Sequence, residues 1–116
     1  MILKKINIFQ IGKTKEGIIT NPAGFLMCTN KFTDKGNVVF IYYPPGVRNE
    51  LHSHEDFETI YYIVEGEGLV TIGEEKELLK KGDLVFTPRK TKHQVVNQGK
   101  ETLIILEVTF RQDRTS

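Results

Sequence analysis

The sequence predicts an all-β protein of the sandwich or barrel type. About ten short runs rich in β-branched and aromatic residues are separated by segments that contain Gly, Pro, Asn or Asp. An apolar pattern at i, i+3 and i+4 never continues for three turns, so we expect no helix of consequence. Many short strands without helices favour a sandwich or a closed barrel.

The first expected strands differ in how much of their surface is covered. Period-two alternation around Ile6 indicates an edge strand, and the Lys-, Glu- and Gly-containing segment 14–24 is expected to be mostly loop. Residues 38–43 are apolar at every position, which predicts a strand covered on both faces before Pro44 and Pro45 end it. The expected strands are residues 3–10, 25–32, 38–43, 50–54, 57–64, 69–72, 77–79, 83–87, 93–96 and 103–110.

Turn signals separate most of the expected strands. Their Gly, Pro and Asn residues are typical of tight connections between antiparallel strands. The turns are expected at residues 34–37, 66–68, 73–75, 80–82, 88–90 and 97–100.

Composition excludes several classes of protein. The 116 residues carry 16 basic and 15 acidic side chains without a basic stripe, so we expect no nucleic-acid partner. The chain shows neither a signal-peptide pattern nor an apolar run long enough to span a bilayer, so no membrane association is expected. The lone Cys28 fits a reducing compartment, and we therefore expect a cytoplasmic protein.

Two histidines at i and i+2 are the strongest chemical signal. His52 and His54 would point to the same face of an extended chain, where two neutral imidazoles can bind one Fe, Ni, Cu or Zn ion. The third histidine, His93, lies far along the sequence beside Val95 and Asn97, which share its expected face. A three-histidine site therefore requires the fold to bring His93 back to the pair.

These residues resemble the two motifs of the cupin family. Gly46, His52, His54 and Gly66 match the first motif, Gly-x5-His-x-His-x3-4-Glu-x6-Gly, within residues 46–66. The second motif, Gly-x5-Pro-x-Gly-x2-His-x3-Asn, is matched within residues 82–97 by Gly82, Pro88, His93 and Asn97. The resemblance implies one cupin domain over residues 1–116, a double-stranded β-helix or jelly-roll barrel. It also implies a metal site at the mouth of the barrel and often a homodimer.

The chain departs from the family pattern at two positions. Lys90 stands where the second motif has a turn glycine. Counting back from Gly66 places Thr59 at the position of the family's carboxylate ligand, while Glu58 is one residue early and would face outward. A bulge could turn Glu58 inward, so it stays open as a fourth ligand. Thr59 would place its hydroxyl near the metal, most simply through a water.

The expected site therefore contains three metal ligands and a pocket beside them. His52, His54 and His93 are the ligands, for a divalent Fe, Zn, Ni, Mn or Cu ion. An alternative is a metal-free pocket in which the imidazoles hydrogen-bond the ligand. The expected pocket residues are Thr59, Tyr61, Ile63 and Val95.

Three classes of function fit such a site. Three-histidine centres resemble those of thiol and diketone dioxygenases in the cupin family, so a metal-dependent oxygenase acting on a small molecule is the first hypothesis. A non-catalytic barrel that binds a sugar or a small carboxylate is the second. A metal-free isomerase or epimerase is the third, and it would need a histidine partnered by a carboxylate or a tyrosine. The expected partners are a small-molecule ligand and a second copy of the chain.

Overall fold

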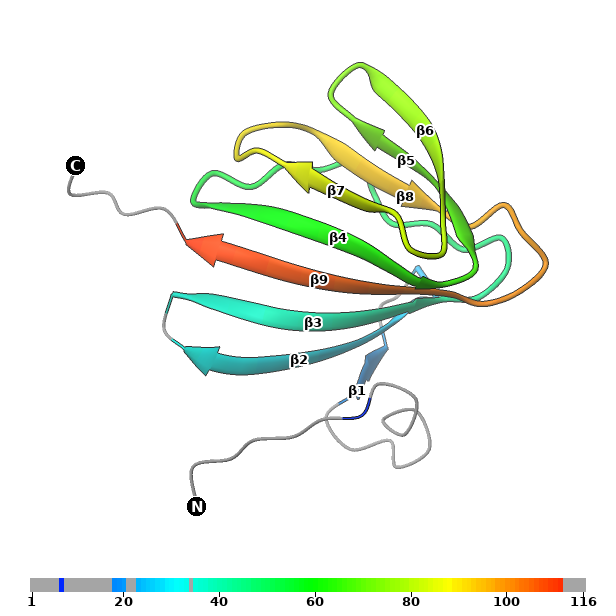
Figure 1. The fold of residues 1–116 in the computed structure, drawn as a ribbon, viewed down its shortest axis with the longest axis horizontal. Coiled ribbons are helices and arrows are strands. Elements are labelled where there is room, and N and C mark those ends of the chain that lie inside the picture. The colour runs from blue at the N-terminus through cyan, green and yellow to red at the C-terminus, as the bar shows by residue number, and fades with distance from the viewer. Residues whose placement is uncertain (1–6, 8–17, 21–22, 34, 112–116) are drawn as a thin grey trace.

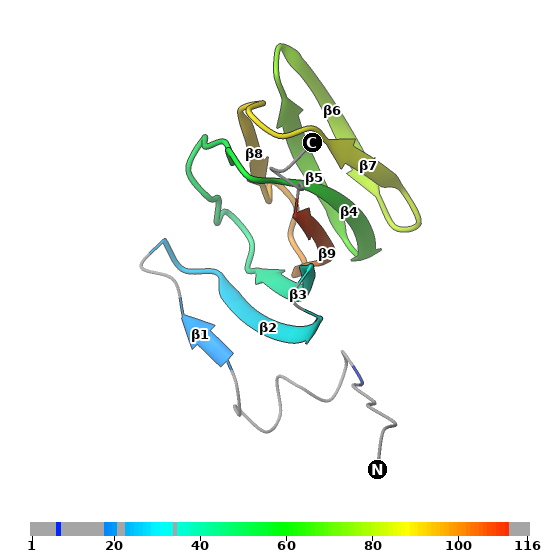
Figure 2. The same cartoon turned by 90° about the vertical axis from the view of Figure 1, so that its left-hand side faces the viewer.

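Two antiparallel sheets face each other across the hydrophobic core (Figures 1 and 2). The computed structural model describes residue 7 and residues 18–20, 23–33 and 35–111. A six-stranded sheet has the order β1-β2-β3-β9-β4-β7, and a three-stranded sheet has the order β6-β5-β8. The strands are β1 (Ile18–Thr20), β2 (Leu26–Thr33), β3 (Gly36–Tyr43), β4 (Phe57–Glu65), β5 (Glu67–Ile72), β6 (Glu75–Lys80), β7 (Leu84–Thr87), β8 (His93–Val96) and β9 (Leu103–Arg111).

The all-β prediction is confirmed, since the described residues contain strands and no helix. Among them, no helix is long and apolar enough to cross a membrane. The strand expected over residues 3–10 lies outside the described residues, apart from Asn7. Within the expected loop 14–24, the short strand β1 pairs with β2 through Ile18 and Cys28. The strand expected over residues 50–54 is wrong, because only His52 forms a bridge there.

Alternate residues of the large sheet build one wall of the core. In β4, Thr59, Tyr61 and Ile63 are at most 2% exposed, whereas Tyr62 between them is 39% exposed. This alternation is what a period of two produces when one face of a strand is covered. Residues from the small sheet complete the same cluster, namely Val70, Leu79 and Val95. Each buried aliphatic or aromatic side chain contributes about 1.5–3 kcal/mol of transfer free energy.

Cross-strand rows on this inner face change from apolar to polar along the strands. Ile63 pairs with Ile105, which pairs with Ile41 on β3. The next inward row contains Tyr61, Glu107 and Val39, and the row after that contains Thr59, Thr109 and Asn37. The strands thus carry polar groups, including one carboxyl, toward one end of the fold.

The outer face of the large sheet is apolar near its β7 edge. Tyr62 on β4 lies opposite Leu84 on β7, and Ile60 lies opposite Phe86. Leu84 is 59% exposed and Phe86 is 49% exposed. Exposed apolar side chains gathered at a sheet edge are typical of interaction surfaces.

We propose that a second copy of the chain covers this outer face. Wild-type protein at micromolar concentration is expected to sediment as a dimer, and Phe86→Glu to shift the equilibrium toward monomer by placing a charge in the interface. Leu51→Glu is the matched control, because Leu51 is 50% exposed but lies outside the sheet. A monomeric wild type in analytical ultracentrifugation would contradict the proposal.

Candidate metal centre

Backbone hydrogen bonds hold the first histidine motif against β8. His52 and His93 exchange both of their backbone bonds, at 3.1 Å from His52 N to His93 O and 2.8 Å in the reverse direction. Gly46 N donates to Asn97 O at 2.9 Å, and Asn97 N donates to Val47 O at 3.0 Å. The segment from Gly46 to His52 therefore runs along β8, and it brings His52 next to His93 despite their distance in sequence.

Asn49 explains why this segment is not a regular strand. Its backbone N–H donates to Val95 O at 3.2 Å, but Val95 N donates to the Asn49 side chain (Oδ1) at 2.7 Å and not to its backbone carbonyl. The Asn49 carbonyl accepts instead from Gln94 Nε2 at 2.9 Å. Side-chain hydrogen bonds thus replace some of the backbone bonds of a regular sheet. An Asn side chain can compete for backbone groups in this way.

Lys90 adopts the conformation for which the second motif normally uses glycine. Its φ of 64° lies in the left-handed region, at a cost of about 1–2 kcal/mol for a residue with a Cβ atom. In this position Lys90 N donates to His54 O at 2.7 Å. The turn after Pro88 therefore keeps its geometry without glycine and secures the backbone of His54.

The three histidines are positioned to bind one metal ion. One ligand nitrogen from each of His52, His54 and His93 lies within 4.8 Å of the others. The ring centroids are 4.2 Å apart for His52 and His93, 4.8 Å for His52 and His54, and 5.1 Å for His54 and His93. Nitrogens about 2.1 Å from a shared ion lie within about 4 Å of one another, so small side-chain rotations complete the set.

Hydrogen bonds to carbonyl oxygens orient two of the rings. His93 Nδ1 lies 2.9 Å from Thr91 O, and His52 Nδ1 lies 2.6 Å from Glu50 O. A carbonyl only accepts, so Nδ1 donates in each ring and Nε2 keeps its lone pair. Carbonyl partners of this kind fix the tautomer of metal-binding histidines.

His93 Nε2 is a buried acceptor without a hydrogen-bond partner among the described residues. Leaving such a group unpaired costs about 1–3 kcal/mol. An ion between the three rings would satisfy it, so the residues present fit a divalent transition metal. The donor set of three imidazoles suits Fe, Ni, Cu or Zn.

The local environment favours the neutral form of His54 and His93. Burial, followed by repulsion from His52 and His93, lowers the pKa of His54 from 6.5 to about 4. Burial also lowers the pKa of His93, although its bond to Thr91 opposes that effect. Neutral imidazole is the form that binds metal, so protons compete weakly for these two rings near neutral pH.

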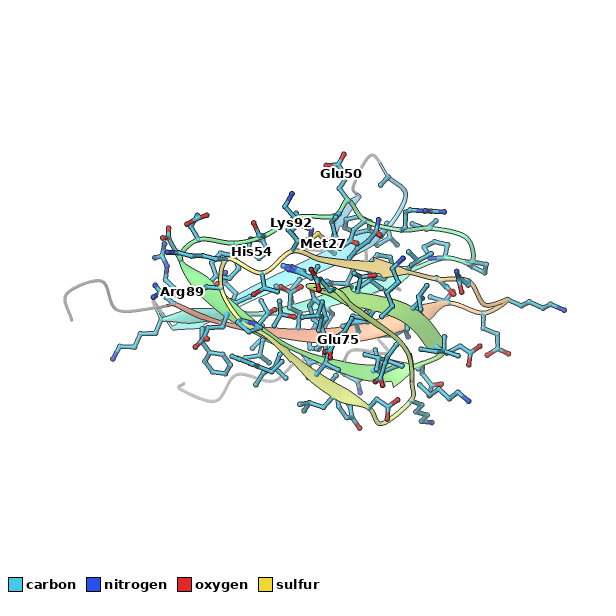
Figure 3. All side chains as sticks on the ribbon, turned by 90° about the horizontal axis from the view of Figure 1, so that it is seen from above. Met27, Glu50, His54, Glu75, Arg89 and Lys92 are labelled. Carbon is cyan, nitrogen blue, oxygen red and sulfur yellow. The ribbon has the colours of Figure 1, made fainter. Side chains whose placement is uncertain are left out.

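Two carboxylates near the histidine pair in sequence lie outside the cluster. Among the described residues, the group that could hold an ion consists of the three histidines, and Glu58 is not part of it. The inward position on β4 belongs to Thr59, as counting back from Gly66 predicts. Figure 3 shows the Glu50 carboxylate pointing away from the body of the fold, so only its backbone carbonyl serves the site.

A cavity of about 790 Å³ lies beside the histidines. Of the four expected pocket residues, only Tyr61 lines it, whereas Thr59, Ile63 and Val95 are buried in the packed interior. The lining residues are Ala23, Phe25, Met27, Asn37, Val39, Ile41, Tyr43, Asn49, Glu50, His52, His54, Phe57, Tyr61, Glu107 and Thr109. The space falls within the range of about 300–1,000 Å³ typical of small-molecule sites.

Glu107 is the cavity residue that sequence reasoning missed. It is 9% exposed on the inner face of β9, and burial raises the pKa of its carboxyl to about 7. The signal was available in the alternation Leu103, Ile105, Glu107, which places a carboxyl at a position expected to be apolar. An acidic residue on the inward face of a strand is a candidate functional group.

Removing one imidazole should nearly abolish metal binding. We expect His93→Ala to lower metal affinity by more than about a hundredfold, since even the loss of a supporting partner costs 10–100-fold. Ser53→Ala is the matched control, because Ser53 is exposed between the two paired histidines. Elemental analysis of protein purified without a His-tag measures the effect. Wild-type metal content in His93→Ala would show that the ion is not held here.

Removing the Glu58 carboxylate should leave metal binding nearly intact. Glu58 is adjacent to the inward position of β4 and is not in the histidine cluster. Metal content of Glu58→Ala within about twofold of wild type is therefore expected on the same assay. A loss as large as that of His93→Ala would show that Glu58 turns inward when the ion binds.

Comparison with known proteins places these features in a family. The model of the cupin domain matches residues 39–109, which include both histidine motifs. An uncharacterized protein of Methanocaldococcus jannaschii is 48% identical over 63 residues, which cover 54% of this chain and 50% of that protein. An oxalate-binding protein of Thermotoga maritima is 38% identical over 65 residues, covering 56% of this chain and 54% of that protein.

Solved structures extend the similarity beyond these segments. The crystal structure of a predicted oxalate decarboxylase from Thermotoga maritima has a TM-score of 0.74 and 29% identity, covering 82% of this chain and 90% of that one. The matched segments span about half the length of the two curated relatives. The family model covers more than half of the chain and agrees with the all-β fold. The chain therefore belongs to the cupin family.

Proposed function

We propose that this chain holds a divalent transition-metal ion through His52, His54 and His93 and uses it to bind a small carboxylate in the adjoining cavity. The observation that carries the proposal is the buried Nε2 of His93, which has no hydrogen-bond partner in the described part of the chain and lies beside the two other imidazoles. When bound, the ion would supply positive charge and open coordination positions to an anionic ligand. A similar protein of Thermotoga maritima is named an oxalate-binding protein, and a similar solved structure from the same organism is described as a predicted oxalate decarboxylase.

The neutral ligand set favours an anion. Three imidazoles leave the full charge of a divalent ion uncompensated, whereas a carboxylate ligand would reduce it. The cavity wall near the histidines includes aromatic surface, with Phe57 stacked on His54 at a centroid distance of 4.2 Å. A low-dielectric surrounding strengthens the attraction between the ion and a carboxylate.

Calorimetric titration of oxalate tests this function. Protein loaded with Zn²⁺ or Co²⁺ is expected to bind oxalate, and chelator-treated apoprotein is expected to bind at least about a hundredfold more weakly. His54→Ala should behave like the apoprotein, and Ser53→Ala like wild type. Equal binding by loaded protein and apoprotein would contradict a metal-dependent carboxylate site. An absence of binding to loaded protein would contradict the choice of ligand class.

A dioxygenase is the second candidate function, and the absence of a carboxylate from the described histidine cluster favours it. Fe(II) held by three neutral nitrogens keeps several positions open, which oxygen-dependent chemistry requires. Oxygen consumption by the Fe(II)-loaded protein with a panel of thiols, diketones and phenolic acids separates the two functions. Consumption that requires one of these compounds would favour the enzyme, whereas oxalate binding without consumption would favour the carboxylate-binding barrel.

A further inference from the structure

We propose that Glu107 is a second recognition group of the cavity, which donates a hydrogen bond to the far end of a ligand held at the histidine centre. This inference rests on the proposed function and narrows its ligand to acids with a second carboxylate. Glu107 and two of the histidines, His52 and His54, line the same cavity. A ligand lodged there can therefore meet both the metal centre and a carboxyl group.

The position of Glu107 is fixed by three paired strands. Glu107 on β9 is in register with Tyr61 on β4 and with Val39 on β3. Tyr61 is 2% exposed and Val39 is 5% exposed, so the flanking side chains leave the carboxyl little freedom to move away. Groups held on strands are positioned more accurately than groups on loops.

The Glu107 carboxyl is a buried polar group on the inner face of β9. Among the described residues, neither a hydrogen bond nor an ion pair to this group is formed, although the residue is only 9% exposed. A buried carboxyl without a partner is destabilising, and such groups persist mainly where they have a function. The remaining exposure of Glu107 is toward the cavity that it lines. A ligand oxygen could satisfy the carboxyl there.

The protonation state of Glu107 favours donation to an anion. Burial raises its pKa to about 7, so the carboxyl is protonated in mildly acidic solution. The titratable groups facing it are Tyr61 on β4 and Tyr43 on β3, whose own pKa values burial and the Glu107 charge raise. Both phenols therefore stay neutral in the pH range in which Glu107 titrates. A protonated carboxyl that donates to a carboxylate forms a charge-assisted hydrogen bond.

The mixed lining of the cavity restricts the rest of the ligand. Phe25, Met27 and Ile41 contribute apolar surface to it. A cavity of about 790 Å³ is far larger than oxalate needs. The cavity thus offers a metal centre, then apolar surface, then the Glu107 carboxyl. These would match a short aliphatic acid that has a chelating 2-oxo or 2-hydroxy carboxylate at one end and a second carboxylate at the other.

Matched ligand pairs test the proposal by calorimetry on the metal-loaded protein. 2-Oxoglutarate and 2-oxopentanoate share a chelating end and differ in the distal carboxylate, and 2-oxoadipate with 2-oxohexanoate repeats the comparison one carbon longer. We expect wild type to prefer the dicarboxylate of at least one pair by about tenfold or more. Glu107→Leu should abolish that preference, while Glu107→Gln, which can still donate, should keep most of it.

A pH series adds a readout that a purely structural role would not change. The wild-type preference should fall between about pH 6 and about pH 8.5, because ionised Glu107 repels the distal carboxylate. Glu107→Gln should show no such change. The role of Glu107 would be overturned if wild type and Glu107→Leu preferred the dicarboxylates equally. It would also be overturned if Glu107→Leu lost the same affinity for both members of each ligand pair.

Oxalate distinguishes a failure of this inference from a failure of the proposed function. Oxalate does not need the distal group, so Glu107→Leu should bind it within about twofold of wild type. Oxalate binding that survives in Glu107→Leu, together with no preference for dicarboxylates in wild type, would refute the inference alone. If neither oxalate nor any 2-oxo acid binds the loaded wild type, the proposed function fails with it.

Discussion

The pairing of residues 46–52 with β8 is the constraint on which the histidine cluster depends. Two reciprocal bonds between the backbones of His52 and His93 bring together residues that are distant in sequence. Closing such a loop costs conformational entropy, which the surrounding sheet bonds and core contacts offset. Because this contact is made by main-chain groups, substitution of a histidine side chain leaves it in place. The barrel can therefore remain folded while the site is altered.

Asn97 extends this constraint to the rest of the barrel. Its buried side chain donates to Tyr43 O and to Glu101 O, both at 2.8 Å, and accepts from Gly99 N at 2.9 Å. One amide thus joins the end of β3, the end of β8 and the turn that leads to β9. All of its partners are backbone groups, and the Asn97 amide supplies both the two donors and the acceptor that they need. The residues that frame the cavity and those that hold the histidines are consequently parts of one hydrogen-bonded unit.

Much of the fold and part of the site could be predicted from the sequence. Period-two alternation correctly indicated β4, and counting from Gly66 placed Thr59 on its inner face, in the part of β4 that precedes the register shift between Ile63 and Glu65. The irregular course of residues 50–54 could not be predicted, because the chain just before them is held to a distant strand by a hydrogen bond from Val95 N to the Asn49 side chain. Residue parity also could not show which inward side chains reach the cavity. Which inward side chains line the cavity depends on how the two sheets pack.

Glu107 shows how the fold separates metal binding from recognition. His93 lies on β8 of the small sheet, and the segment that carries His52 and His54 is bridged to β8. Glu107 lies on β9 in the large sheet. An ion held by neutral nitrogens requires no carboxylate from the barrel wall, so the one on β9 is available to a ligand. Its raised pKa follows from the same apolar wall that strengthens attraction between an ion and an anion. The low-dielectric interior therefore lets this carboxyl hold its proton in mildly acidic solution, where it can act as a donor.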